Sequence, residues 1–233
     1  MPVHAYTNWN IREADSEEKI EPYRKYFIIC EGANTEVFYF RELIDNRKQL
    51  EINPLIDLIL WEKTDSDRDI TYPKYLFDFA IKQKNLEENH FDTNHDKMVI
   101  VFDGDIFEEK VVGYKELISM IEENDIAAVT NPSFELFLLL HIPDSYNNYI
   151  KGAEDKYLTK DEKGKYSLAR NILTDVTGIN PKRNKDIGKL ANNIQIAIMQ
   201  EKNINQDVHN IKGRVSSNLG AIIKSIIDEK IEL

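Results

Sequence analysis

The sequence has few of the residues on which several common kinds of site depend. One cysteine among 233 residues leaves no partner for an internal disulfide and excludes a cysteine-rich zinc site. Acidic residues outnumber basic ones, 41 to 30, and the formal net charge is −11. Because attraction to phosphates needs basic surface, a nucleic acid could be held only by a local basic patch or through a bound metal.

Long apolar runs are also missing. No stretch approaches the roughly 18–20 apolar residues that cross a membrane. The N-terminal stretch MPVHAYTNWNIREADSEEKI has no apolar segment like that of a signal peptide. We therefore expect a cytoplasmic protein without membrane contact.

The hydrophobic residues, 42% of the chain, form alternating predicted strands and helices. Residues 25–30 and 98–102 are continuous apolar runs, typical of strands covered on both faces, and residues 126–130 predict another strand. Helical spacing predicts helices over NTEVFYFRELIDN and TYPKYLFDFAIKQKN and around Tyr114 to Ile121. The segment INPLIDLILW fits either a strand or a short helix. This alternation predicts an α/β fold, with a mostly parallel sheet flanked by helices.

The character of the sequence changes after His141. Residues 142–166 are polar and predict loops or an insertion, whereas 167–176, 186–202 and 216–231 predict helices, the last capped by Ser216 and Ser217. We expect a lead-in over 1–24, a core over 25–141, and an insertion with a helical C-terminal region over 142–233 that packs on the core.

Carboxylates follow two of the predicted strands. Glu31 ends the first strand, and Asp103 and Asp105 follow the second. Parallel sheets bind ligands at the carboxyl ends of their strands, and residues two apart on extended backbone point the same way. An oxygen-rich cluster suits Mg²⁺ or Mn²⁺. The alternative is that Glu31 is a polar strand end and that the two Asp residues cap a loop or are solvated.

Three segments, CEGANTEVFYF, VIVFDGDIF and NPSFELFLLLH, occur in that order, and the tail contains SSNLGAIIKSI. With these, roughly residues 25–231 resemble the RloB-like family, whose members carry a Toprim-like domain and occur in bacterial defence loci. The resemblance implies a Toprim-like Rossmannoid fold and a metal-dependent phosphotransfer site. It gives Glu31 the role of metal ligand or acid/base, and it gives Asp103 and Asp105 the binding of Mg²⁺. It also implies a partner ATPase of the ABC or AAA type in abortive infection.

Two further glutamates stand in these segments. Glu135 interrupts the apolar stretch FELFLLLH, where a charge is costly without a partner, so it is a candidate catalytic residue or one half of a structural ion pair. Glu36 either favours the N-terminus of its helix or belongs to the site. His141 either interacts with the end of a helix or lies near the phosphate.

The densest basic cluster is NPKRNKDIGK. Its Lys182, Arg183 and Lys185 are the predicted nucleic-acid contacts, and Lys212 and Arg214 form a second short basic stretch. The alternative is that both stretches are solvated surface.

Three hypotheses for the function follow. The first is a nuclease that cuts RNA or DNA with Mg²⁺ under the control of an ATPase. The second is a non-catalytic module that uses the same fold to bind an ATPase or a nucleic acid. A phosphoacceptor receiver domain is a third, but it needs an acidic pair on the first strand, where only Glu31 is present. A homo-oligomer is compatible with the first two.

Overall fold

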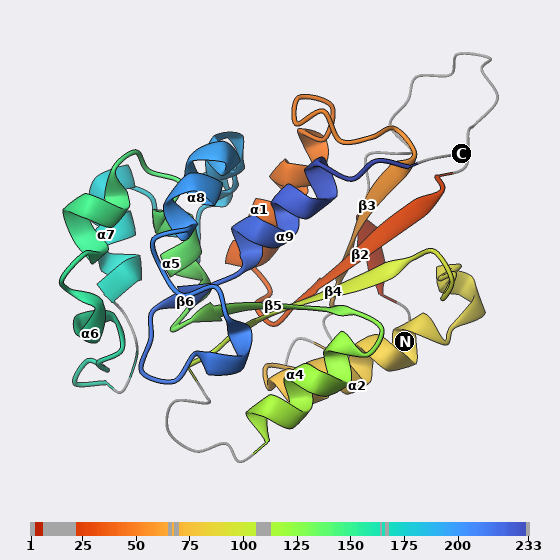
Figure 1. Ribbon diagram of the computed structural model, residues 1–233, viewed down its shortest axis with the longest axis horizontal. Helices are drawn as coiled ribbons and strands as arrows, with labels where there is room; N and C mark the ends of the chain where they lie inside the picture. Colours follow the sequence, from red (N-terminus) through yellow and green to blue (C-terminus); the bar gives the residue numbers. More distant parts are fainter. Residues whose placement is uncertain are drawn as a thin grey trace.

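The computed structural model describes residues 3–6, 22–64, 67, 70–105, 113–163, 165 and 168–231. Its centre is a six-stranded sheet in the order β1-β3-β2-β4-β5-β6 (Figure 1). The strands are β1 (His4–Tyr6), β2 (Arg24–Cys30), β3 (Ile56–Glu62), β4 (Lys97–Asp103), β5 (Ile126–Asn131) and β6 (Ser216–Ser217). The four central strands are parallel, and the edge strands β1 and β6 are antiparallel to their neighbours. The predicted α/β class is confirmed, and the sheet is Rossmann-like.

Helices cover both faces of this sheet (Figure 1). One side carries α1 (Thr35–Asp45), α5 (Phe134–Leu139), α7 (Leu168–Thr177), α8 (Ile194–Glu201) and α9 (Leu219–Ile227), and the other carries α2 (Pro73–Lys84) and α4 (Tyr114–Glu122). Alternate residues of β2 supply the two cores, with Ile28 and Cys30 on the α1 side and Phe27 and Ile29 on the α2 side. Among the described residues, no helix is long and apolar enough to cross a membrane.

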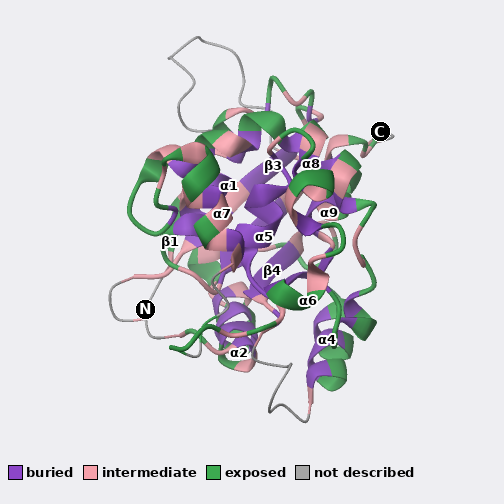
Figure 2. Ribbon diagram, turned by 90° about the vertical axis from the view of Figure 1, so that its left-hand side faces the viewer, coloured by how far each residue is buried: buried purple, intermediate pink, exposed green. Residues whose placement is uncertain are grey.

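The C-terminal third shares the core on the α1 side of the sheet. Buried residues of α7, α8 and α9 belong to the same apolar cluster as those of β2 and α1, and Figure 2 shows buried residues continuing from the sheet into the helices. The helical turns of η5 (Lys185–Asn193) lie along α1. There Gly188 is so close to the main-chain carbonyl of Phe38 that a Cβ would not fit. The segments η4 (Tyr146–Ile150) and α6 (Glu154–Tyr157) are short helical turns within the stretch predicted as loops or an insertion.

The structure defines three segments that the sequence left open or for which it predicted something else. The ambiguous segment forms β3, because its apolar residues are buried between β1 and β2. Ser216 and Ser217 were predicted to cap the last helix, but they form β6 and pair with the edge of β5, and α9 begins at Leu219 with Asn218 as its N-cap residue. The Ser217 hydroxyl nevertheless accepts a hydrogen bond from the Leu219 N–H at 3.4 Å. Within the predicted lead-in, His4–Tyr6 forms the edge strand β1, and residues 7–21 lie outside the described residues.

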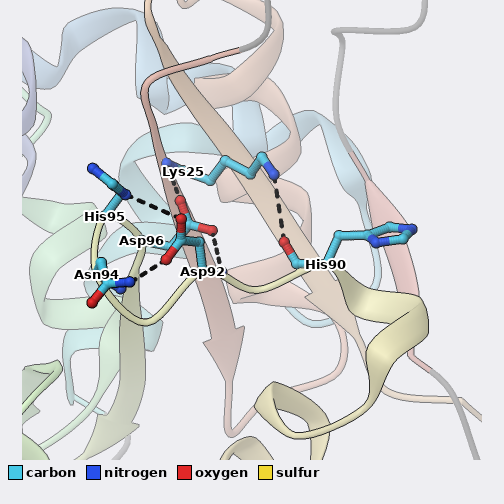
Figure 3. Close-up of polar contacts among 6 residues, drawn as sticks. All are labelled: Lys25, His90, Asp92, Asn94, His95 and Asp96. Atoms are coloured by element: carbon cyan, nitrogen blue, oxygen red, sulfur yellow. Dashed lines mark hydrogen bonds and ion pairs between the residues drawn. The ribbon is translucent and has the colours of Figure 1, made fainter.

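The opposite end of the sheet has its own acidic loop, between His90 and Asp96 (Figure 3). The Asp96 carboxylate accepts hydrogen bonds from the backbone N–H of Lys25 at 2.8 Å and of Asp92 at 2.9 Å. The Asp92 carboxylate lies 3.0 Å from Nδ1 of His95. These contacts tie the loop to the start of β2, so we assign its acidic residues a structural role.

Candidate functional site

Two of the predicted site residues meet where β2 and β4 end. The strands are parallel neighbours, with Cys30 opposite Val101, and the backbone N–H of Glu31 donates to the Val101 carbonyl at 2.8 Å. The backbone N–H of Asp103 donates to Oε2 of Glu31 at 3.0 Å. The structure therefore brings Glu31 and Asp103 together at one edge of the sheet.

The Asp103 side chain also contacts the start of α5. Its Oδ1 accepts a hydrogen bond at 2.8 Å from the backbone N–H of Phe134, the first residue of that helix. Burial, together with the negative charges of Glu31 and Glu36, raises the pKa of Asp103 well above its usual range. Asp103 is partly buried, and a carboxylate with a raised pKa favours a proton or a cation as its partner.

Asp105 lies beyond the end of β4. The strand ends at Asp103, and Gly104 turns the chain while its N–H donates to the Thr130 carbonyl at 2.7 Å. The prediction that both Asp side chains point the same way assumed an extended backbone through residue 105. Because β4 ends at Asp103, that reasoning does not apply to Asp105. Asp105 is partly exposed. Burial is the largest cause that raises the pKa of Glu31, and the negative charge of Asp105 adds to the shift.

The carboxyl group of Glu31 has a pKa that is shifted toward neutral pH. Burial raises the pKa of Glu31 to about 8, and the carboxylates of Asp105 and Glu36 add to the shift. The hydrogen bond from Asp103 and the charge of Lys63 oppose it. The Lys63 ammonium, just after β3, donates to the main-chain carbonyl of Glu31. A carboxyl group with this pKa can both hold and release a proton at neutral pH, as general acid–base catalysis requires.

Glu36 also faces this site, and the sequence left its role open. It lies in the first turn of α1 and is buried, and burial raises its pKa. Its carboxylate occupies the space where residue 32 would carry a Cβ, so a larger residue at Gly32 would displace it. Its Oε2 is buried and has no hydrogen-bond partner among the described residues. The signal was present in the sequence, because Glu36 shares the helical spacing of the buried Phe40 and Leu43.

A second buried glutamate shows how the fold treats a structural carboxylate. The Glu201 carboxylate accepts hydrogen bonds from the Ser217 hydroxyl at 2.6 Å and from the backbone N–H groups of Gly220 and Ala221, both at 2.8 Å. These bonds satisfy both oxygens and hold the N-terminus of α9. The contrast with Oε2 of Glu36 indicates that Glu36 is placed for a ligand rather than for a cap.

Glu135 and Lys182 form an ion pair beside these acids. Lys182 Nζ lies 3.3 Å from Oε1 of Glu135, which is buried at the start of α5. The Lys182 side chain is 47% exposed. Partial desolvation lowers the pKa of Lys182, but the charges of Glu135 and Glu36 outweigh it, so that the pKa is raised overall. The lysine offsets part of the negative charge at this edge of the sheet.

The chain around Lys182 is attached to the N-terminus of α1. The Thr35 hydroxyl donates to the Pro181 carbonyl at 3.0 Å, and the Asn34 side chain donates to the Lys182 carbonyl at 3.4 Å. Of the predicted nucleic-acid contacts, Lys182 is thus placed at the carboxylates. Arg183 and Lys185 are exposed on the following turns. No spacing rule connects residues 35 and 181, so this placement could not be read from the sequence.

His141 lies away from the strand ends, inside the core. Its Nε2 is 3.0 Å from the Tyr39 hydroxyl, and its Nδ1 is 3.0 Å from the Phe137 carbonyl. Burial lowers the pKa of His141 to about 4. The contact with the Phe137 carbonyl lies in the last turn of α5, which agrees with the predicted interaction with the end of a helix. The imidazole is neutral and buried rather than beside a phosphate site, so we assign it a structural role.

A polar cavity of about 190 Å³ adjoins Glu31 on the β3 side. Gly32 and Asn34 line it from the turn before α1, and Arg41, Trp61 and Lys63 line it from α1 and the end of β3. Glu62 also lines it and is ion-paired with Arg41, so a ligand at the strand ends would extend toward both basic and acidic side chains.

The donor atoms at this edge suit a hard cation such as Mg²⁺ or Mn²⁺, because they are carboxylate oxygens and include one buried oxygen without a partner. No three His, Cys, Asp or Glu side chains within the described part of the chain have the spacing that would hold one ion in this structure. Local partners explain the spacing: Glu31 and Asp103 accept from backbone N–H groups, and Glu135 is paired with Lys182. A cation would have to draw some of these oxygens away from those partners.

Together these features define an α/β protein with a Rossmann-like sheet and a carboxylate-rich site at its strand ends. The sequence matches the family described as RloB-like protein over residues 26–228. The chain therefore belongs to the RloB-like family. No curated protein and no solved structure matches it.

Proposed function

We propose that this protein is a Toprim-type nuclease that hydrolyses phosphodiester bonds of RNA or DNA with Mg²⁺ or Mn²⁺. The observation that carries the proposal is the juxtaposition of Glu31 and Asp103 across two adjacent parallel strand ends, with Glu36 buried beside them and lacking a partner for Oε2 among the described residues. Glu201, a structural carboxylate of this protein, has hydrogen-bond donors at both oxygens. An incompletely satisfied acid cluster at a sheet edge is the arrangement expected of a cation site.

The residues have different roles in this proposal. Asp103 and Asp105 would hold the cation together with Glu31, and Glu36 is a further candidate ligand. A bound cation would neutralise phosphate charge and lower the pKa of a water molecule. Glu31 would act as a metal ligand or as the group that exchanges protons, because it lies beside Asp103 at the strand ends. Glu135 positions Lys182, whose ammonium group offsets negative charge on a phosphate.

The reaction is a simple hydrolysis. A water oxygen forms a bond to phosphorus, and the bond from phosphorus to one sugar oxygen breaks. The water loses a proton to a basic group at the site, and the departing sugar oxygen gains one. Glu31, which lies beside Asp103 at the strand ends, is the candidate group for these proton transfers.

The cellular context belongs to the same proposal. The family resemblance supports a role as effector of a bacterial anti-phage system, with an ABC- or AAA-type ATPase as the partner that restrains or triggers it. A cytoplasmic location is part of this proposal.

The direct test is cleavage of labelled RNA and DNA by the full chain, with and without the partner ATPase, in Mg²⁺, Mn²⁺ or EDTA. We expect cleavage that needs the divalent ion and is lost in Glu31→Gln and in Asp103→Asn. Glu116→Gln, which removes an exposed carboxylate from α4, is the matched control and retains cleavage. Equal cleavage by the Glu31→Gln and Asp103→Asn variants would refute the assignment.

One observation favours a second candidate, a non-catalytic module that binds an ATPase or a nucleic acid. In the described part of the chain, Glu31, Asp103 and Glu135 already have partners, and no three acids there have metal-binding spacing. This alternative predicts that no trigger elicits cleavage, and that the carboxylate variants bind the ATPase or nucleic acid as the wild type does.

A further inference from the structure

A second basic segment lies next to the candidate site, on the opposite side from Lys182. It is the turn from Ile211 to Arg214, which contains Lys212 and Gly213. Gly213 has a φ of +67°, and the Arg214 N–H donates to the Ile211 carbonyl at 2.9 Å, which closes the turn. Lys212, Gly213 and Arg214 are all exposed.

The turn is fixed to the site by a buried amide. The Asn131 side chain, at the end of β5, donates hydrogen bonds to the carbonyls of Ile211 at 3.0 Å and Arg214 at 2.8 Å. A Cβ built on Gly104 would lie 2.8 Å from Cδ1 of Ile211 and 3.0 Å from Cβ of Asn131. Gly104 separates Asp103 from Asp105, so the turn packs directly against the link between these two acids.

The surrounding loop is compact. The Asn205 side chain donates to the carbonyls of Asp207 and Asn210 at 3.0 and 3.1 Å and to the Ser216 hydroxyl at 2.8 Å. The Ser217 N–H returns a hydrogen bond to the Asn205 carbonyl at 2.9 Å, which closes the loop. A loop closed and filled by its own polar groups holds its exposed side chains in fixed positions.

The two basic segments approach the strand ends from opposite faces of the sheet. Ile211 belongs to the apolar cluster on the α2 and α4 side, whereas Lys182 comes from a segment bound to α1. In Figure 1 the loop before β6 lies next to the end of β5. A chain of phosphates crossing the ends of β2 and β4 would therefore have cationic groups on both sides.

Charge favours a polyanion at this turn. Many cations of this acidic protein are neutralised by a neighbouring carboxylate, as in the pairs Arg47–Asp57, Lys84–Asp125 and Lys189–Asp186. No ion pair within the described residues involves Lys212 or Arg214. These two exposed cations are therefore available to the spaced charges of a sugar-phosphate backbone.

We propose that the turn Ile211–Arg214, anchored by Asn131, binds the nucleic-acid backbone beside the scissile phosphate through Lys212 and Arg214. This inference rests on the proposed nuclease function and adds the surface that aligns the substrate. These side chains would bind phosphates and not bases, so the turn contributes affinity and position but no sequence preference.

The experiment measures binding of a short fluorescein-labelled single-stranded RNA, and of the same sequence as DNA, by anisotropy over a series of salt concentrations. Ca²⁺ replaces Mg²⁺ so that binding is followed without cleavage. The test variant is Lys212→Gln with Arg214→Gln. The matched control is Lys48→Gln with Lys82→Gln, which removes two exposed cations from the opposite end of the sheet.

We expect the test variant to bind at least about tenfold more weakly at low salt. The slope of log K against log salt should become shallower by about 0.7 to 0.9 for each phosphate that the turn no longer neutralises. The control should match the wild type, and thermal melting should show both variants folded, because the exchanged side chains are exposed. The RNA and DNA arms show which backbone the turn prefers.

Equal affinities and slopes for the test variant and the control would overturn the inference, and so would a wild type that binds neither probe. The nuclease proposal is judged separately, by Mg²⁺-dependent cleavage of the same probes by the wild type. Weaker binding by the test variant without any wild-type cleavage would support the turn as a nucleic-acid contact and count against the nuclease.

Discussion

The backbone N–H of Asp103 donates a hydrogen bond to Oε2 of Glu31 at 3.0 Å, across the ends of two adjacent parallel strands. This single contact fixes the separation of the two acids that define the site. It leaves two carboxylates, each with a raised pKa, at the same edge of the sheet. Charge at this edge should therefore destabilise the fold when no cation is bound.

Glu31→Gln should remove part of this destabilisation. The pKa of Glu31 is about 8 in the folded protein, above the ordinary 4.5, so its contribution to stability is complete below about pH 4.5 and is lost as the pH rises through 8. Between about pH 6 and pH 8, the loss from this group is about 2 kcal/mol. Urea unfolding in EDTA at these two pH values should show that the free energy of unfolding decreases less for Glu31→Gln than for the wild type.

Glu116→Gln is the control for that experiment, because it removes an exposed charge outside the site. Its free energy of unfolding should decrease between the two pH values as much as that of the wild type. If Glu31→Gln shows the same decrease as well, the Glu31 carboxylate ionises freely in the folded protein.

Gly32→Ala tests the placement of Glu36. The new methyl group would meet the Glu36 carboxylate, the end of a flexible side chain, and Gly32 does not have a positive φ. Stability should therefore change by less than about 1 kcal/mol. Displacement of a carboxylate from the site should nevertheless reduce Mg²⁺-dependent cleavage by about tenfold to a hundredfold.

A double-mutant cycle with Glu36→Gln tests whether Gly32→Ala reduces cleavage by displacing Glu36. If Glu36 acts at the site, Gly32→Ala should cause little further loss of activity in the Glu36→Gln background. Additive losses would show that Gly32 acts on activity through something other than Glu36.

His141 should make the fold sensitive to acid. Its pKa is about 4 in the folded protein and ordinarily 6.5, so its contribution to stability is complete above about pH 6.5 and is lost as the pH falls through 4. The full effect is about 3 kcal/mol. His141→Gln should be less stable at neutral pH, because it disturbs the contact with Tyr39, but its stability should fall less between about pH 7 and pH 4.5.

Urea unfolding at the two pH values measures this effect. His95→Gln is the matched control, since His95 is partly exposed and contacts Asp92 in the loop at the other end of the sheet. The same acid sensitivity in His141→Gln and the wild type would exclude His141 as its source.

The sequence predicts the parts of this structure that depend on local pattern. The apolar runs at 25–30 and 98–102 indicated two central strands, and the carboxylates that follow them indicated the position of Glu31 and Asp103. The β3 segment stayed ambiguous because a short apolar run fits a strand or a helix until a neighbouring strand is present. Ser216 and Ser217 form a strand only because the edge of β5 is available to them.

The parts of the site that could not be predicted depend on contacts between distant segments. Lys182 reaches the acids because Thr35 binds the chain at Pro181. The turn at Lys212 reaches them because Asn131 binds both ends of that turn. Sequence spacing describes single helices and strands, and neither contact lies within one.

The most direct test of the central claim is calorimetric titration of Mn²⁺ and Mg²⁺ into the wild type and into Asp103→Asn with Asp105→Asn. Glu116→Gln serves as the control. If the strand-end carboxylates form a metal site, the wild type and the control bind the ion in the micromolar range or tighter, and the double variant does not. Unchanged binding by the double variant, or no binding by the wild type, would contradict the assignment of these carboxylates to a metal site.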